Sequence, residues 1–484
     1  MILKELKFFL PEITLILSSI YILLYGIFFK DNENLKKNIF YITIIAFLLA
    51  LYFCLNIKPN DNIFFNELLI NNEFTQFFKI LVLFGTLAVV LLSYNYLNDL
   101  GILKSEFFFL ISLATVGSLV IISANNIISM YLGLELQSVC LYILATYRSD
   151  YLKSSESGVK YFILGALSSA ILLYGISLIY ASTNSMDFYE ISKKIIESSD
   201  ISSNSLIIST GFVLVLSGLF FKIAVVPFHM WAPDVYEGSP TNITAFFTTI
   251  PKIGALAILI KFLNIPFSFY QENWIQILYI ISIVSMLLGS IAAINQSNIK
   301  RLLAYSSIGH MGFILLGTLA ANQFGIKTVQ LYLLIYTVTI LGFFTCLLSI
   351  KDEKEGKYLE EIKSFSGLLK KNSFLAFSML IMLFSLAGIP PIAGFFSKLY
   401  VLLSIIDKNL YLIATIAVFS MIISAFYYLK IIKIVFFDQP LNPIHCEIAF
   451  SSGIIIYLSI ILNIFFIFFS SKILDFLETS SNIN

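Results

Sequence analysis

Five ionisable residues lie inside long apolar stretches of the sequence, where charged side chains are rare. They are Glu135, Lys160, Lys222, Lys252 and Lys398. A charge at the centre of a membrane-spanning helix costs roughly 2.5–3.5 kcal/mol on insertion scales, so such a residue usually faces a polar interior and has a function. Lysine and glutamate both bind and release protons. The chemistry that these residue types can perform together is proton transfer.

Lys222 lies in the most informative stretch, FKIAVVPFHMWAPDVYEGSPT, at residues 221–241. It follows residues 207–221, a run without any charged residue. Pro227 has no N–H, so the carbonyl of Ile223 lacks its helical donor, and a free carbonyl beside a buried amine requires water or another polar group. We therefore predict a broken helix that lines a hydrated pocket. A lysine that reaches the membrane surface from a proline-capped helix end is the alternative.

The other four residues differ in depth. Lys252 lies about eleven residues into its span and Lys398 follows the double break GIPPIAGFFSK, so neither reaches the surface easily. Lys160 is only about four residues into its helix and could extend to the interface instead. Glu135 has apolar neighbours on both sides in MYLGLELQSVCLY. A lysine partner would allow both groups to remain charged.

Three further ionisable residues give weaker signals. His310 lies within the helical stretch LLAYSSIGHMGFILLG. A lone histidine there is more often a hydrogen-bonded core residue than a proton relay, so it is a secondary candidate. Asp234 and Glu237 lie in the turn PDVYEGSP, where acidic residues more often cap a helix or fix a loop than carry protons.

The composition identifies the class of protein. Apolar residues make up 58% of the chain and charged residues 12%, against about 25% charged residues in soluble domains. This is a polytopic membrane protein. The net charge of +1 gives no indication of a nucleic-acid partner, and the four widely spaced cysteines indicate neither a disulfide framework nor a metal site. The first apolar run is too long for a signal peptide and is expected to remain as a helix.

Apolar runs of about 20 residues recur along the chain and predict an all-α protein with fourteen transmembrane helices. The predicted helices are residues 9–29, 38–57, 77–98, 106–124, 126–147, 157–181, 205–228, 241–263, 273–294, 301–320, 327–350, 373–404, 409–436 and 450–470. We expect breaks in the seventh and twelfth helices, near Val226–Pro227 and Gly388–Pro391. Each break would free a carbonyl that only a polar interior can satisfy.

We predict one membrane domain, residues 1–484, built around two inverted five-helix repeats. Its parts are the first three helices (1–100), the two repeats (101–265 and 270–437) and the last helix (438–484). Lys222 and Lys398 then occupy the fourth helix of each repeat, an arrangement typical of transporters with broken helices near the midplane.

The basic residues predict an orientation. Fourteen helices place both termini on one side of the membrane. The loops on the opposite side carry sixteen lysines and arginines, against nine on the terminal side. Since cytoplasmic loops are enriched in these residues, both termini are expected outside the cytoplasm or the mitochondrial matrix.

Several stretches resemble a known family. LELQS, SGVKYFILGALSSAILLYG, FKIAVVPFHMWAPDVYEGSPT, PKIGALA, NIKRLLAYSSIGHMGF and AGIPPIAGFFSKLY are similar to subunit N of proton-pumping NADH:quinone oxidoreductase, respiratory complex I, whose mitochondrial counterpart is subunit 2. PFHMWAPDVYEGSP alone is shared with the wider group of antiporter-like subunits and multisubunit cation/proton antiporters. LELQS and GVKYFILGA narrow the resemblance to subunit N.

The resemblance implies a function and its residues. It implies a subunit that translocates protons, driven by electron transfer from NADH to quinone in other subunits. The proton-transfer residues it implies are Glu135, Lys222, Lys252 and Lys398, with Lys160 and His310 as secondary members. It implies that NAD, FMN, iron–sulfur clusters and quinone bind to partner subunits and that this chain holds no cofactor or metal. The implied partners are neighbouring antiporter-like and small membrane subunits in the bacterial inner membrane, or the mitochondrial one.

Two alternatives remain open. One is a subunit of a multisubunit Na⁺/H⁺ antiporter, and the other is a scaffold subunit that does not pump. The relay hypothesis makes two geometric predictions. Glu135 and Lys222 should lie within direct or one-water reach, and Lys222, Lys252 and Lys398 should lie in that order at similar depth. His310 should lie near the line between the last two.

Overall fold

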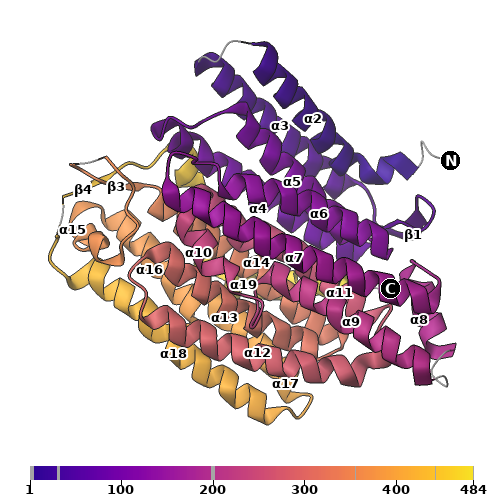
Figure 1. Ribbon diagram of the computed structural model, residues 1–484. Coiled ribbons are helices and arrows are strands. Elements are labelled where there is room, and N and C mark those ends of the chain that lie inside the picture. Colours follow the sequence, from indigo (N-terminus) through magenta and orange to yellow (C-terminus); the bar gives the residue numbers. More distant parts are fainter. Residues whose placement is uncertain (1–4, 30–32, 198–201, 355, 442, 483–484) are drawn as a thin grey trace.

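The computed structural model describes residues 5–29, 33–197, 202–354, 356–441 and 443–482. Long helices lie side by side in one bundle (Figure 1). Both termini, β1 and α8 lie towards one end, which we call the terminal end, while β3, β4 and α15 lie at the opposite end, the far end. The placement of both termini at one end agrees with an even number of crossings.

The first helices form one edge of the bundle (Figure 1). They are η1 (Lys7–Phe9), α2 (Leu10–Phe28), α3 (Glu33–Asn56) and α4 (Glu73–Asp99), with the antiparallel strands β1 (Asn60–Phe64) and β2 (Leu69–Asn71) between α3 and α4. The side chain of Asn72 accepts a hydrogen bond from the Thr75 N–H and caps α4. α4 packs on α3, α5 and α11 and thereby joins this edge to the rest of the bundle.

Ten spans form two five-helix units. The first consists of α5 (Ser105–Ser123), α6 (Ile127–Ala145), α7 (Leu152–Thr183), α9 (Ser202–Ile223) and α11 (Thr241–Asn264). The second consists of α12 (Gln271–Ile294), α13 (Ile299–Leu319), α14 (Gln323–Leu347), the two halves α16 (Ser373–Ala387) and α17 (Ala393–Ile406), and α18 (Tyr411–Phe437). The last long helix is α19 (Phe450–Ser480).

Short elements connect these spans. They are α8 (Phe188–Glu197), α10 (Trp231–Gly238), η2 (Ser268–Tyr270), η3 (Ile362–Phe365), α15 (Leu368–Lys371) and the antiparallel pair β3 (Ile350–Asp352) and β4 (Ile444–Cys446). The apolar periodicity did not predict the strands, because they are three to five residues long and lie in loops.

The two units share one packing pattern. α5 packs against α6 and α11 in the first unit, as α12 packs against α13 and α18 in the second. α7 lies along α9, and α14 correspondingly lies along α16 and α17. Because each unit contains an odd number of spans, the second begins at the opposite end from the first, which makes the repeats inverted.

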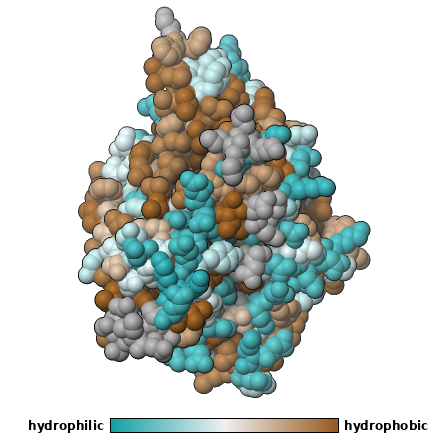
Figure 2. All heavy atoms as spheres, turned by 90° about the vertical axis from the view of Figure 1, so that its right-hand side faces the viewer, coloured by the Kyte–Doolittle hydropathy of each residue, from teal (hydrophilic) through white to brown (hydrophobic). Residues whose placement is uncertain are grey.

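The predicted helix number is confirmed. Within the described residues, thirteen helices are long and apolar enough to cross a membrane, and the shorter halves α16 and α17 together supply the remaining span. In the most apolar 18-residue segment of each span, every residue of α11 is buried, whereas only 33% of the residues are buried in α2, α3 and α19. Hydrophilic side chains lie across the terminal end (Figure 2). Large exposed hydrophobic residues instead cover the flanks of the bundle, where lipid or partner helices would lie.

Both predicted breaks are present. α9 ends at Ile223, earlier than the predicted residue 228, and residues 224–230 separate it from α10. α16 ends at Ala387, and α17 begins at Ala393. The peptide bonds before Pro227 and Pro391 are cis. By contrast, Pro251 lies inside the continuous helix α11 and opens no break there.

Candidate proton-transfer site

Lys222 lies in the last turn of α9, where the helix stops because of the break. Its side chain is buried, and its ammonium nitrogen donates to the Ser138 hydroxyl of α6 over 2.6 Å. The indole of Trp231 donates to the carbonyl of Phe221 over 3.0 Å. This bond ties the start of α10 to the last turn of α9, but the Phe221 carbonyl also accepts the Ala224 N–H and is not the Ile223 carbonyl for which the proline argument predicted a polar partner.

Glu135 and Lys222 are close but do not touch. The two side chains form no direct ion pair; instead the Ser138 hydroxyl, three residues after Glu135 on α6, accepts a hydrogen bond from the Lys222 ammonium. Glu135 is only partly buried, because it lies beside the exposed residues Leu132 and Leu136 on the outer side of α6. It is near enough to act on Lys222 electrostatically. That a single water molecule can bridge the Glu135 carboxylate and the Lys222 ammonium remains a prediction.

Lys252 lies at the centre of the protein, 1% exposed, on the fully buried helix α11. Its ammonium nitrogen donates to the Ser307 hydroxyl of α13 over 2.5 Å. The Tyr336 hydroxyl of α14 also donates to Ser307, over 3.1 Å. The ring of Tyr236 lies 5.5 Å from the ammonium. Lys252 therefore connects the first five-helix unit to the second.

His310 follows Ser307 by three residues on α13, which places it about one helical turn further along. Its Nδ1 lies 2.7 Å from the Tyr332 hydroxyl and its Nε2 lies 3.1 Å from the Tyr428 hydroxyl. Tyr428 also hydrogen-bonds Ser306. Both ring nitrogens are thus matched to groups that can donate or accept. This is the arrangement of a satisfied core histidine, and it also suits a relay.

Lys398 occupies the break in the second unit. Its ammonium nitrogen donates to the carbonyls of Leu386 and Ala387 over 2.8 and 3.0 Å. These are the last carbonyls of α16, which have no helical donor. The sequence argument that a break exposes carbonyls to a polar partner is therefore confirmed at this second break.

Two small cavities join His310 to Lys398. Each is lined by both residues. The larger offers about 20 Å³ for the centres of water molecules, which is about the room that a single water requires. Lys252 is thus hydrogen-bonded to Ser307, Tyr336 joins Ser307 to the ring of His310, and the cavities join His310 to Lys398. Among the described residues, no hydrogen bond joins Lys222 to Lys252, and their common depth remains a prediction.

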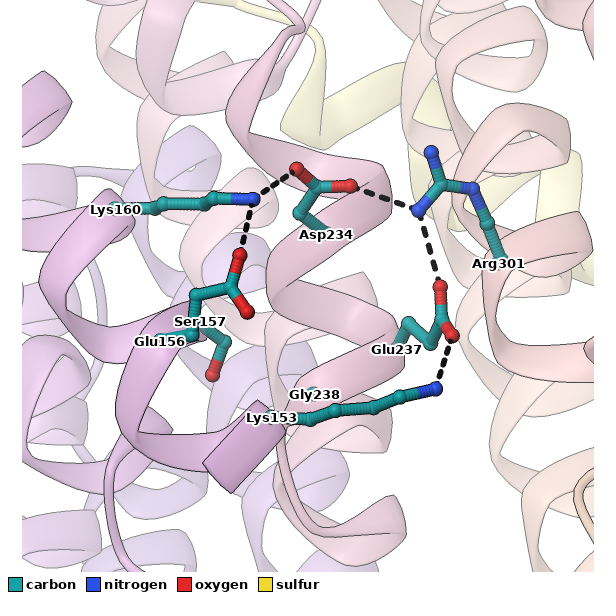
Figure 3. A pocket seen from close by; sticks show the side chains of 8 residues that line it. All are labelled: Lys153, Glu156, Ser157, Lys160, Asp234, Glu237, Gly238 and Arg301. Atoms are coloured by element: carbon teal, nitrogen blue, oxygen red, sulfur yellow. Dashed lines mark hydrogen bonds and ion pairs between the residues drawn. The ribbon is translucent and has the colours of Figure 1, made fainter. Parts of the chain in front are cut away.

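Lys160 lies apart from this series. Its ammonium nitrogen pairs with Glu156 at 2.8 Å and with Asp234 at 2.9 Å, and its side chain is 43% exposed. It belongs to a surface cluster on α7, α10 and α13 (Figure 3). α7 begins at Leu152, five residues before the predicted start, and the side chain of Lys160 turns to the carboxylates of Glu156 and Asp234 at the surface.

The rest of this cluster is a chain of ion pairs (Figure 3). Arg301 pairs with Asp234 at 2.7 Å and with Glu237 at 3.0 Å, while Lys153 pairs with Glu237 at 2.9 Å. Partial burial raises the pKa of Asp234. The hydrogen bonds and charges of Lys160 and Arg301 together lower it by a larger amount, so that the net pKa lies below its ordinary value. The cluster holds α10 against α7 and α13, in agreement with the loop-fixing role expected of the two acids.

Sequence reasoning missed several buried charged residues, three of which are Glu12, Lys79 and Lys261. Lys79, counted with the terminal-side loops, lies inside α4 and pairs with Glu12 of α2 at 2.8 Å. Lys261, near the C-terminal end of α11, is 1% exposed and donates to the carbonyls of Ile122 and Ala124. All three lie within two turns of a helix end, where the sequence does not distinguish burial from extension into water. The one signal in the sequence for this buried ion pair was Glu12, a glutamate in the first turn of an apolar run.

Comparison with known proteins agrees with this arrangement. Residues 124–424 match the family model described as "NADH:quinone oxidoreductase/Mrp antiporter, TM". NADH-quinone oxidoreductase subunit N from Pelagibacter ubique is 43% identical over 97% of this chain and 98% of its own length. The chain belongs to the subunit N family. Subunit N from Beijerinckia indica is 47% identical over 78% of each chain.

Solved structures extend the subunit N assignment to the fold. A chain of respiratory complex I from Thermus thermophilus with bound aureothin superimposes with a TM-score of 0.76 at 27% identity, over 93% of this chain and 97% of that one. A chain of the Mrp complex from Dietzia has a TM-score of 0.83 at 17% identity, over 99% and 97%. The latter shows the fold alone. As a member of the subunit N family, the chain is an antiporter-like membrane subunit of NADH-quinone oxidoreductase and works with its other subunits.

Proposed function

We propose that this chain itself translocates protons across the membrane when the complex transfers electrons from NADH to quinone. The observation that carries the proposal is the buried, connected series of Lys252, Ser307, His310 and Lys398, which crosses from one five-helix unit to the other. We infer that NAD, FMN, iron–sulfur clusters and quinone bind in partner subunits, since the series moves protons and no electrons. The basic-residue bias supports both termini outside the cytoplasm.

Lysines suit the storage positions of such a series. An ammonium group carries one removable proton, and its flexible stem allows the nitrogen to change partners. Ser307 accepts from Lys252 and can donate in turn, because a hydroxyl is both donor and acceptor. His310 offers two ring nitrogens in opposite roles when neutral. With Tyr336 between Ser307 and His310, and water in the cavities between His310 and Lys398, a proton could pass between the two lysines through groups that each accept one hydrogen and donate another.

Electrostatics would drive the movement. Two unit charges 4 Å apart interact by about 4 kcal/mol at an effective dielectric constant of 20. Glu135 and Lys222 lie farther apart than a direct ion pair, so a change of charge at Glu135 changes the proton affinity of Lys222 by less than this amount. The neighbouring subunits would supply that change, because Glu135 lies on the partly exposed side of α6.

The test is Lys252→Met in the intact complex, in its native membrane. We expect proton pumping and NADH:quinone reductase activity to fall by at least about tenfold, as for loss of a group that transfers protons. NADH oxidation by a water-soluble acceptor reports assembly and should not change. A scaffold role predicts normal pumping in Lys252→Met, and that result would refute the proposal. A Na⁺/H⁺ antiporter predicts Na⁺-dependent transport without NADH oxidation.

A further inference from the structure

Three buried ionisable side chains lie together near the terminal end, outside the series described above. Glu12 and Lys79 form their ion pair with side chains only 7% and 1% exposed. Lys261 is close enough to Lys79 for the two ammonium groups to repel each other. α4 and α11, which carry the two lysines, pack directly together. Two ammonium groups and one carboxylate thus share one buried region.

The contacts of Lys261 suit a group that changes protonation state. Its nitrogen donates to the carbonyls of Ile122 and Ala124 over 2.9 and 3.1 Å. These carbonyls lie at the end of α5 and have no helical donor. A neutral amine has two hydrogens and an ammonium has three. Lys261 therefore keeps both contacts with or without its third proton.

Buried polar groups lie between this region and Lys222. Gln137 directly precedes Ser138, the acceptor of Lys222, and donates from Nε2 to the Ser118 hydroxyl of α5 over 2.6 Å. Ser118 lies one turn before Ile122, whose carbonyl accepts from Lys261. Gln137 and Ser118 are 1% and 0% exposed. Buried polar side chains on α6 and α5 thus lie between the surroundings of Lys222 and those of Lys261.

We propose that Glu12, Lys79 and Lys261 form a further proton-binding site, reached from Lys222 by way of Gln137 and Ser118. The proposal rests on the proposed translocation function and adds a branch towards the terminal end. Neither Glu12 nor Lys79 lies in residues 124–424, the part that matches the family model.

The charge count explains why this group can store a proton. With all three groups charged, the site carries one net positive charge. Release of one proton by a lysine leaves the site neutral, with the carboxylate still paired to the other lysine. No charge is then left without a partner, which in a buried site costs several kcal/mol. A structural ion pair would need only Glu12 and Lys79, and the second ammonium next to it would only add repulsion.

The decisive variant is Lys261→Arg in the intact complex, reconstituted in vesicles. Arginine keeps the positive charge and can still donate to both carbonyls, but it does not deprotonate in proteins. We expect the rate of proton pumping to fall as far as it does in Lys252→Met. Lys261→Met should show the same loss. Lys194→Arg is the matched control, since Lys194 also donates to a carbonyl near a helix end but is exposed to water.

The outcomes separate the two proposals. Normal pumping in Lys261→Arg, together with defective pumping in Lys252→Met, overturns the branch and leaves the translocation function intact. Normal pumping in both overturns the translocation function. Where Lys261→Arg does not assemble, the double variant Glu12→Gln/Lys79→Met removes both charges of the pair together. Its rate of proton pumping should fall if the site stores protons, and a normal rate overturns the branch.

Discussion

Ala224 and Gly388 occupy the same position at the ends of the two interrupted helices. Both have positive φ, 59° and 83°. In both, this residue donates its N–H to the carbonyl three residues back, and the next N–H donates to the carbonyl five residues back. This is the Schellman arrangement that commonly ends helices. The inverted repeats therefore end α9 and α16 with the same hydrogen bonds, with alanine in one and glycine in the other.

The first prediction concerns Ala224. Ala224→Gly should be nearly neutral, because relief of the left-handed conformation, about 1–2 kcal/mol, is offset by loss of a buried methyl and by the entropy of glycine. Ala224→Val should destabilise the protein by about 1–3 kcal/mol, since a β-branched residue is strained at positive φ. Thermal unfolding of the purified complex, followed through this subunit, provides the measurement. Equal stability of the Ala224→Gly and Ala224→Val variants would show that residue 224 does not have a positive φ in the complex.

The second prediction concerns Gly388. A Cβ at this position would lie 2.9 Å from Cδ of Lys398, and alanine would also be strained at this φ. Gly388→Ala should therefore move Lys398 away from the carbonyls of α16 and reduce pumping as strongly as Lys398→Met does. Gly356→Ala is the control, because Gly356 also has positive φ but has open space around it. A defect of equal size in both variants would point to backbone strain alone.

The third prediction concerns the two tyrosines at His310. Tyr332→Phe and Tyr428→Phe each remove the hydroxyl next to one ring nitrogen. A buried polar atom without a partner costs about 1–3 kcal/mol, so the histidine should change tautomer or orientation. We expect slower pumping with normal assembly in both variants. In NMR of the ¹⁵N-histidine-labelled complex, the ring resonances of His310 should shift in both variants relative to the unmodified protein. An unchanged spectrum would contradict the hydrogen bonds of His310 with Tyr332 and Tyr428.

The sequence predicted those features that depend on local physics. The lengths of the apolar runs defined the spans, and the missing N–H of proline located the breaks beside Lys222 and Lys398. The acceptors Ser138 and Ser307 could not be predicted, because serines are common in these helices and only tertiary packing selects one. Lys160 and Lys79 lie at similar depth from their helix ends. One pairs at the surface with Asp234 and the other is buried against Glu12, a difference set by distant parts of the chain.

The last prediction concerns the surface cluster around Asp234. Burial raises the pKa of Glu237, but Lys153 and Arg301 together lower it by a larger amount. The net pKa of Glu237 is therefore depressed, as is that of Asp234. Carboxyl groups with a depressed pKa in the folded state stabilise it above their ordinary pKa, near 4, and lose this contribution as the pH falls through the folded value. Protonation should therefore loosen α10 from α7 and α13 in acid.

The variant Asp234→Asn tests this reasoning. At pH 7 it should lower the unfolding temperature of the complex, by the equivalent of at most about 1 kcal/mol, because the cluster is partly exposed and screened by salt. The difference from the unmodified protein should shrink as the pH falls from about 4 towards the depressed pKa of Asp234, below which Asp234 itself is neutral. Asp150→Asn is the matched control, since Asp150 pairs loosely with Arg148 at 3.7 Å and is 69% exposed. Because α10 follows the break after Lys222, Asp234→Asn should also slow pumping. A constant temperature difference between pH 7 and pH 3 would mean that the ion pairs do not hold α10 in place.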